Sequence, residues 1–270
     1  MTIPNLLETR NLEKEYVLKK KSLFGGEADT LKAVNGVSLS VQEGETLGIV
    51  GESGCGKSTF ARLISRLITP TAGKVIFDQQ DLTALPKEKI RTIRKDIQMI
   101  FQDPYASLDP RKRILAILTE PLAIHGIGTP AERKEQALEM LEKVGLQKDY
   151  ANRYPHEFSG GQCQRINIAR ALMLRPRLVI CDEPVSALDV SIQAQVLNLL
   201  LDLQDEFQLT YIFISHDLNV VRYFCDRIAV MYMGAVVEEG VAEEIYTYPQ
   251  HAYTKKLLAA IPQQINKSPA

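Results

Sequence analysis

The chain has 270 residues, 45% of them hydrophobic, which is enough to fill a sizeable core in one large domain or two smaller ones. Its 32 basic and 33 acidic residues nearly cancel, so no global basic excess points to nucleic acid as a partner. We expect no secretory signal and no membrane-spanning segment, because no apolar run approaches roughly eighteen residues. This pattern excludes an integral membrane protein. It predicts a soluble intracellular protein that associates with a membrane only through partner subunits.

The amino-terminal part of the chain predicts two antiparallel strands and then a buried one. The first two cover residues 6–12 and 31–41, with a turn at Asn35-Gly36 breaking the second. An exposed basic loop is expected between them, over residues 19–26. The apolar run Thr46–Val50 is typical of a buried strand.

A glycine-rich segment follows this buried strand and opens a helix. It reads Gly51-Glu52-Ser53-Gly54-Cys55-Gly56-Lys57-Ser58-Thr59. Strand, turn and helix come in the order that a phosphate-binding loop requires, although a solvated lysine on an ordinary glycine-rich turn is the alternative. Backbone N–H groups can curl around the phosphates of ATP, while Lys57 neutralises their oxygens and the Ser58 hydroxyl ligates Mg²⁺. We therefore predict that the whole segment binds ATP and that Lys57 takes part in catalysis.

Strand patterns become sparse after this helix. A turn at residues 70–73 leads into a strand at 74–77, and Ile97–Ile100 predicts one more short strand. From residue 103 to 176 such patterns largely vanish. This interval is therefore expected to be helical.

One helix in the interval carries clear boundary signals. Thr129 caps the helix, and Pro130 lies in its first turn. Glu132 completes the capping box, and Gly145 ends the helix. Its buried stripe is expected at Leu138, Leu141 and Val144, with charged residues facing out. We predict a scaffolding role for this helix.

A second glycine-rich turn lies in the same interval and opens another helix. It reads Ser159-Gly160-Gly161-Gln162. Ser159 can cap the helix while the glycines expose backbone N–H groups, which makes the turn a sound anion site. The turn suggests a second phosphate-facing surface, so that the first loop of one protomer and the second loop of another can enclose a single ATP.

The carboxyl-terminal part alternates strands with helices. Strands are predicted at Leu178–Asp182, Thr210–Ser215 and 227–233, helices at 191–205, Leu218–Phe224 and 252–261, and a polar tail at 263–270. This alternation predicts an α/β fold with a parallel core and a helical insertion rather than a chain of repeats.

Two carboxylates, Asp182 and Glu183, end the first of these strands, at the edge where open α/β sheets place ligands. A solvated acidic strand end is the ordinary alternative, but beside a phosphate loop two acids can divide the work. Asp182 is then expected to hold the Mg²⁺ shell, partly through water. Glu183 is expected to polarise the water that attacks the γ-phosphate.

The four cysteines, Cys55, Cys163, Cys181 and Cys225, lie far apart without metal-ligand spacing, which favours reduced cytosolic thiols. The last three are predicted to be small buried residues. Cys55 differs because it lies inside the phosphate loop. Its alkylation is expected to block nucleotide binding, and ATP is expected to protect it.

In this order, the motifs closely resemble the nucleotide-binding subunit of ATP-binding-cassette (ABC) transporters over nearly the whole chain. The matching segments are the Walker A loop at 51–58, the Q-loop at Gln102, the signature at 158–162, Walker B at Leu178–Asp182, the catalytic base at Glu183, the D-loop at 186–189 and the switch histidine at His216. The resemblance implies a P-loop NTPase cassette with a mainly parallel core sheet, an amino-terminal antiparallel β-subdomain and a helical subdomain insertion. It implies one ATPase domain at 1–262, with the core at 1–101 and 177–248, the helical signature subdomain at 102–176 and a C-terminal helix at 249–262.

The resemblance also assigns roles to single side chains. His216 would organise the attacking water, although an ordinary polar loop histidine is the alternative. Gln102 would reach the Mg²⁺ shell, act in catalysis and move the helical insertion with nucleotide state. Tyr16 would stack on adenine, unless it only packs in its strand. The residues expected to contact ATP held by the opposing subunit are Ser159, Gly160, Gly161, Gln162 and Asp189, although Asp189 can instead cap the following helix.

Four segments narrow the resemblance to the oligopeptide, dipeptide and nickel importer branch, and within it to the second, F-type ATPase subunit. They lie at 101–104, 153–158, 186–195 and 249–254. The implied function is an ATP-hydrolysing subunit that energises an importer at the cytoplasmic face of the inner membrane, with peptides as the favoured cargo. Nickel, haem-like solutes and antimicrobial peptides are alternative cargoes. A soluble ABC ATPase in translation or DNA maintenance is an alternative function, as is an exporter subunit.

The implied cofactors are ATP and Mg²⁺, and the implied partners are those of an importer. The partners are a second ABC ATPase subunit in a heterodimer, two transmembrane permease subunits and, indirectly, an extracytoplasmic solute-binding protein. No nucleic acid is expected as a partner. A homodimer is the alternative to the heterodimer. Residues 103–113 are the candidate docking region, with an exposed loop of incidental basic residues as the alternative. Many members of the branch carry a cysteine-containing tail linked to an iron–sulfur cluster, but no cysteine follows Cys225, so no cluster is expected.

Overall fold

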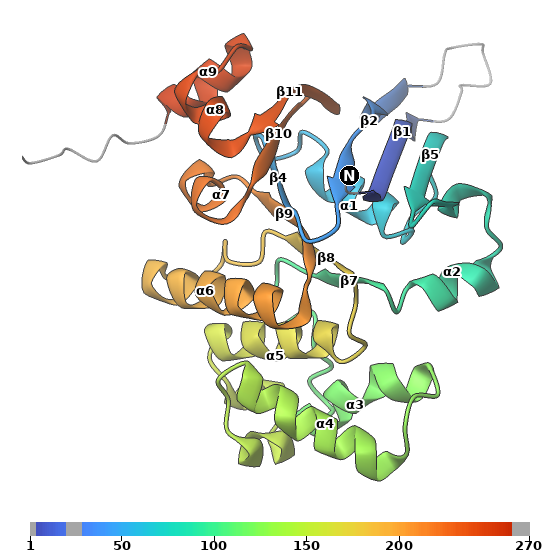
Figure 1. The fold of residues 1–270 in the computed structure, drawn as a ribbon, viewed down its shortest axis with the longest axis vertical. Coiled ribbons are helices and arrows are strands. Elements are labelled where there is room, and N and C mark those ends of the chain that lie inside the picture. Colours follow the sequence, from blue (N-terminus) through green and yellow to red (C-terminus); the bar gives the residue numbers. More distant parts are fainter. Residues whose placement is uncertain (1–3, 20–28, 261–270) are drawn as a thin grey trace, which may run out of the picture.

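The computed structural model describes residues 4–19 and 29–260. Nearly all of the predicted basic loop at 19–26 and the whole predicted tail at 263–270 lie outside the described residues. Two β-sheets and a set of helices make up the described part of the chain (Figure 1).

The central sheet has six strands. Their order is β11 (Ala235–Val241), β10 (Arg227–Tyr232), β4 (Thr46–Val50), β9 (Thr210–Ser215), β8 (Leu178–Asp182) and β7 (Ile97–Ile100). All neighbouring strands are parallel except β10 and β11. Every residue of β4, β8 and β9 is buried, which explains why these strands have continuous apolar runs instead of alternation.

The two faces of this sheet carry two separate hydrophobic cores. One cluster takes Val179, Cys181, Tyr211 and Phe213 from β8 and β9, and the other takes Leu178, Ile180, Ile212 and Ile214. Successive side chains of a strand point to opposite faces, so each strand is held between both cores. This packing fixes the carboxyl end of β8, where Asp182 and Glu183 stand.

The second sheet is antiparallel and corrects one prediction. Its strands are β2 (Asp29–Val37), β1 (Asn5–Lys19), β5 (Ala72–Phe77) and β6 (Gln80–Asp81), with β3 (Ser40–Gln42) also paired to β1. The predicted turn at Asn35-Gly36 is wrong, because β2 runs through both residues. The register between β1 and β2 shifts there, and Gly36 has a φ of +66°, so the pair forms a bulge within the strand.

The helices lie around both sheets. They are α1 (Lys57–Ile64), α2 (Lys87–Ile93), α3 (Ile114–Ile124), α4 (Pro130–Lys143), α5 (Gly160–Leu172), α6 (Val190–Phe207), α7 (Leu218–Phe224), α8 (Ala242–Thr247) and α9 (Ala252–Ala259), with short 3₁₀ helices at Leu82–Ala84, Lys148–Asn152 and Pro155–Glu157. Figure 1 shows α3, α4 and α5 gathered at one end of the molecule, and among the described residues no strand lies between β7 and β8. Within residues 4–19 and 29–260, no helix is both long and apolar enough to cross a membrane.

Helix α4 has the predicted ends and a slightly different buried face. Thr129 and Glu132 form the capping box, and Gly145 follows the helix with a φ of +74°. Leu141 and Val144 are buried as predicted, whereas Leu138 is only half-buried. Ala137 and Met140 complete the buried face instead, because the helix is rotated so that this stripe meets the core.

A tight hairpin between β10 and β11 ends the predicted strand at 227–233 one residue early. Met233 and Gly234 form its loop with φ values of +46° and +81°, the left-handed conformation that two-residue hairpins of type I′ require. Strand β11 then returns beside β10. The sequence pattern alone indicates neither this strand nor the short helices α2 and α8.

Candidate functional site

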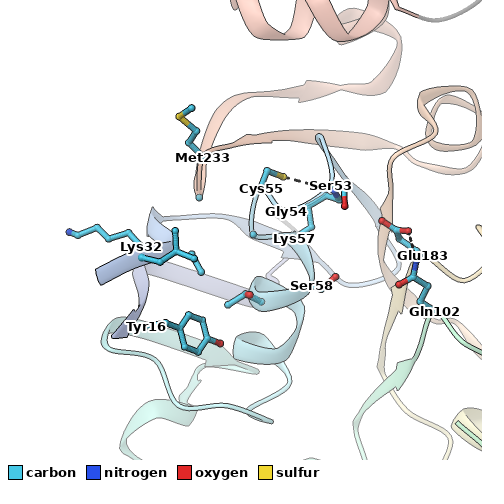
Figure 2. Close-up of a pocket in the computed structure, with 15 residues that line it drawn as sticks. Tyr16, Lys32, Ser53, Gly54, Cys55, Lys57, Ser58, Gln102, Glu183 and Met233 are labelled. Atoms are coloured by element: carbon cyan, nitrogen blue, oxygen red, sulfur yellow. Dashed lines mark hydrogen bonds between the residues drawn. The ribbon is translucent and has the colours of Figure 1, made fainter. Parts of the chain in front are cut away.

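A cavity of about 610 Å³ lies between the antiparallel sheet, the glycine-rich loop before α1 and the carboxyl ends of β7 and β8. Figure 2 shows Tyr16 on one side of it, Gln102 and Glu183 on the other, and Lys57 and Ser58 between them. The predicted site residues that line it are Tyr16, Ser53, Gly54, Cys55, Gly56, Lys57, Ser58, Thr59, Gln102 and Glu183. Gly51, Glu52 and Asp182 do not line the cavity but hydrogen-bond to residues that do.

Two glycines allow the loop to pass close to other backbone. A Cβ on Gly51 would lie 2.2 Å from the Met231 carbonyl oxygen, and a Cβ on Gly56 would lie 2.1 Å from that of Ala33. Both distances are too short for any side chain, and both residues have positive φ. Gly54 also has a positive φ, of +82°, but faces open space. The loop conformation therefore depends on glycine for two reasons, close packing and backbone angle.

The Lys57 side chain crosses the inside of this loop. It is buried, and its Nζ donates to the carbonyl oxygens of Gly51 at 2.7 Å and Glu52 at 2.9 Å. A buried ammonium needs such acceptors because an unpaired one would be very unfavourable. The loop thus holds one positive charge at the cavity wall, at the amino end of α1.

A hydrogen bond joins Ser58, in the first turn of α1, to Asp182 at the carboxyl end of β8. The Ser58 hydroxyl donates to Asp182 Oδ1 at 2.9 Å, and Asp182 is buried. Burial raises the pKa of Asp182 and the nearby Glu183 carboxylate raises it further, while the Ser58 hydrogen bond lowers it, and the net pKa lies above the ordinary value. A hydroxyl and a carboxylate are the hard oxygen donors that suit Mg²⁺, so these residues fit that ion.

Three side chains that are distant in sequence meet at Glu183. Gln102 Nε2 donates to Glu183 Oε2 at 2.9 Å, and His216 Nδ1 lies 3.3 Å from the same oxygen. Glu183 has a φ of +50°, a left-handed conformation that is unusual for a residue with a side chain. Its backbone N–H donates to Ile214 O at 3.0 Å, which ties this conformation to β9. No sequence pattern predicts that backbone angle.

Tyr16 lies at the cavity and not in a core. The residue is 39% exposed, and Lys14 Nζ stands 5.3 Å from the ring centroid. The lysine is itself held by a hydrogen bond to Thr69 O at 2.8 Å. The ring therefore presents surface to the cavity on which a planar group can stack.

The second glycine-rich turn lies outside this cavity. Ser159, Gly160, Gly161, Gln162 and Asp189 are all absent from its lining. Ser159 is exposed and forms a capping box with Gln162 at the start of α5. A Cβ on Gly160 would lie 3.6 Å from Leu188, so the turn is next to the segment that precedes α6.

Asp189 stands at the amino end of α6 but does not cap it with its side chain. Its carbonyl oxygen instead accepts the N–H groups of Ile192 and Gln193, both at 2.9 Å. The alternative prediction, that the Asp189 side chain caps α6, is therefore wrong. Its carboxylate is left for other contacts.

Several residues of the site carry no sequence signal. Lys32, Ala33, Met233 and Gly234 complete the cavity wall from β2 and the β10–β11 hairpin. Gly234 N–H donates to Cys55 O at 2.9 Å, so the β10–β11 hairpin is hydrogen-bonded to the backbone of the phosphate loop. Strand pairing between distant segments places these residues, and a motif search along the chain cannot find them.

A phosphate loop between the buried parallel strand β4 and helix α1 lies in the same site as two carboxylates at the carboxyl end of β8, the next strand but one in the sheet. This arrangement defines a P-loop ATPase. The family model for the ABC transporter matches residues 34–186. The chain belongs to this ABC transporter family, as an ATPase subunit coupled to transport. The predicted fold, family and enzyme class are thereby confirmed.

Relatives and solved structures agree on this family. The oligopeptide transport ATP-binding protein AppF of Bacillus subtilis is 55% identical and covers 95% of this chain and 78% of its own length. OppF of Salmonella typhimurium, with the same description, has the same identity and coverage. The dimeric ATP-binding cassette MJ0796, in a post-hydrolysis state bound to ADP and Pi, superimposes with a TM-score of 0.77 at 34% identity, over 87% of this chain and 98% of that one.

Proposed function

We propose that this chain hydrolyses ATP to drive the import of peptides through two permease subunits at the cytoplasmic face of the inner membrane. The names of AppF and OppF state oligopeptide transport, and their 55% identity extends over 95% of the chain. The observation that carries the hydrolytic part is the convergence of Gln102, Glu183 and His216 beside the phosphate loop. An extracytoplasmic solute-binding protein would deliver the peptide to the permeases.

The reaction proposed is in-line attack of water on the γ-phosphorus, which breaks the bond from this phosphorus to the β–γ bridging oxygen and releases ADP and phosphate. Lys57 neutralises charge on the phosphate oxygens, and the loop N–H groups bind them. Glu183 accepts a proton from the attacking water, and His216 orients that water and contacts the γ-phosphate. Gln102, bonded to Glu183 in this structure, holds the carboxylate in place. The adenine ring stacks on Tyr16.

Ser58, Gln102 and Asp182 are the residues that we propose for Mg²⁺, with Asp182 acting partly through water. The hydrogen bond between Ser58 and Asp182 supports this assignment, because it holds a carboxylate directly behind the Ser58 hydroxyl, which lines the cavity. When bound, Mg²⁺ would neutralise charge that develops on the phosphate oxygens.

The second glycine-rich turn is proposed to act on ATP that another ATPase subunit holds. Ser159, Gly160, Gly161, Gln162 and Asp189 would provide these contacts, since none of them lines the cavity of its own chain. A heterodimer with a related ATPase subunit is the favoured assembly. We also propose the domain division given above, with the core at 1–101 and 177–248, the helical signature subdomain at 102–176 and the C-terminal helix at 249–262, so that Gln102 stands at the junction.

The experiment that tests this function is peptide uptake by the assembled complex. The chain is purified with its copurifying ATPase and permease subunits and inserted into vesicles, and labelled oligopeptide is supplied with its binding protein. Uptake that needs ATP and is lost in Lys57→Ala supports the proposal. Stimulation of ATP hydrolysis by nickel or a haem-like solute but not by peptide would contradict the cargo, and copurification with ribosomes or DNA would contradict transport. Stoichiometric iron and sulfide in the protein would contradict the expected absence of a cluster.

A further inference from the structure

The segment from Pro249 to Thr254 is anchored so that it directs one tyrosine inward. The Glu238 carboxylate of β11 accepts the backbone N–H groups of Gln250 at 2.6 Å and His251 at 3.0 Å. His251 Nδ1 in turn accepts the N–H of Tyr253 at 3.2 Å and so caps α9. Tyr253 is only 7% exposed, and the centroid of its ring lies 4.2 Å from the ring centroid of Tyr232.

The hydroxyl of Tyr253 ends at the phosphate loop. It accepts the backbone N–H of Glu52 at 3.0 Å. That N–H belongs to the same peptide unit as the Gly51 carbonyl, which accepts the Lys57 ammonium at 2.7 Å. The described residues contain no cis peptide bonds, and in a trans peptide the N–H and C=O groups point in opposite directions. One peptide plane is therefore held between Tyr253 on one side and Lys57 on the other.

We infer that Tyr253 is a positioning residue for ATP binding: through the Gly51–Glu52 peptide, its hydroxyl fixes the carbonyl that orients the Lys57 ammonium. This inference rests on the proposed role of Lys57. Without the hydroxyl, the Glu52 N–H loses its acceptor and the peptide is free to rotate. The Lys57 ammonium then loses its fixed position relative to the phosphates, and nucleotide affinity falls.

A single substitution can isolate this contact without unfolding the loop. A second link to the loop, Gly234 N–H to Cys55 O at 2.9 Å, joins backbone to backbone and does not depend on the Tyr253 side chain. Tyr253→Phe also keeps the ring against Tyr232. Tyr248→Phe is the matched control, because Tyr248 is in the same part of the chain but is 72% exposed.

The test is a double-mutant cycle on the full chain, with the dissociation constant of Mg–ATP measured by titration calorimetry. Tyr253→Phe is expected to raise that constant about tenfold, the effect of one lost hydrogen bond to a positioned group, while Tyr248→Phe leaves it unchanged. Both variants should have the thermal unfolding midpoint of the wild type within a few degrees. In a Lys57→Ala background, Tyr253→Phe should change the constant less than twofold, because no ammonium is left to orient.

Three results would overturn the inference, and they can be told apart. An unchanged affinity in Tyr253→Phe would show that the contact has no effect on binding. A tenfold loss in both the wild-type and Lys57→Ala backgrounds would mean that Tyr253 supports the loop independently of Lys57. Unchanged affinity in Lys57→Ala alone would remove the proposed role of Lys57 and the inference with it.

Discussion

Glu183 combines an unusual backbone angle with two side-chain neighbours, and both constrain where its carboxylate points. Gln102 and His216 both approach Oε2, so the other carboxylate oxygen remains for a substrate water. A φ of +50° costs free energy that the surrounding bonds must offset. At such a position, a change in the charge of the side chain tests chemistry more directly than a change in its size.

Glu183→Gln should therefore keep ATP binding and lose hydrolysis. The amide has nearly the size of the carboxylate but cannot accept the proton of water, and a general base contributes roughly 10²–10⁴-fold to a rate. ATP affinity should stay within about threefold, since the phosphate loop is unchanged. The measurement is phosphate release under saturating ATP, with Glu135→Gln on the exposed face of α4 as the control. Full hydrolysis in Glu183→Gln would remove Glu183 from the mechanism.

Cys55 should react slowly with iodoacetamide at neutral pH and faster as pH rises. Burial raises the pKa of its thiol above the ordinary 9.0 although Lys57 acts in the opposite direction, and only the thiolate is nucleophilic. Labelling should therefore still be increasing above pH 9. ATP should protect the thiol, because Cys55 lines the cavity.

Mass spectrometry of the labelled chain tests this expectation, and Cys55→Ala identifies the labelled site. The other cysteines are buried, and burial also raises their pKa values, to about 11 for Cys163. Equal labelling of Cys55 with and without ATP would show that nucleotide does not cover it.

At the scale of elements, α5 must approach α6 closely at one glycine. A Cβ on Gly161 would lie 2.6 Å from Ile192 Cγ2, whereas a Cβ on Gly160 would lie 3.6 Å from Leu188, an ordinary contact. The two glycines are adjacent in the same first helical turn. They therefore form a matched pair for testing the packing of these helices.

Gly161→Ala should destabilise the fold by about 1–3 kcal/mol, because the added methyl group overpacks the contact with a branched side chain. Gly160→Ala should be neutral or slightly stabilising, since alanine is favoured over glycine in helices by about 0.5–1 kcal/mol. Urea unfolding midpoints compare the two variants. If both gave the same midpoint, α5 and α6 would not be as closely packed as the structure has them.

The elements that could be predicted from the sequence are those with strong local signals. The strands β8 and β9 and the helix α7 have the predicted limits, because each combines an apolar run or periodicity with clear flanking residues. The bulge at Gly36 could not be predicted, because it depends on how β2 pairs with β1. Strand β11 could not be predicted either, because its residues AVVEEGV do not alternate apolar with polar and none of them is fully buried. The same holds at the site: Lys57 follows from its motif, but the left-handed angle of Glu183 and the bond between Tyr253 and Glu52 are products of packing.

For the whole molecule, the two glycine-rich turns lie on different surfaces of one chain. The first lines the cavity and the second does not, although Ser159 and its neighbours form an exposed, capped helix start. Under the proposed function, the first turn holds the nucleotide of its own chain, and the second turn has no nucleotide to contact within the described part of that chain. Two chains placed with each turn over the cavity of the other would use both.

Ser159→Arg should distinguish this arrangement from a structural role of the turn. In the isolated chain, ATP affinity should stay unchanged, because the residue is outside the cavity. In the complex with the partner ATPase and permeases, ATP hydrolysis should fall at least about tenfold, because the large charged arginine side chain disrupts the opposing site. The two measurements are the dissociation constant of ATP for the isolated chain and the rate of ATP hydrolysis by the complex.

The substitution also removes a helix cap, which costs about 1 kcal/mol, and Thr129→Arg controls for that loss. Thr129 forms an equivalent capping box at the start of α4. Both variants should lose similar stability in urea, yet only Ser159→Arg should lose hydrolysis in the complex. A similar loss of hydrolysis in both variants would show that reduced helix stability causes the effect. It would contradict the proposed contact between Ser159 and the ATP of the opposing subunit.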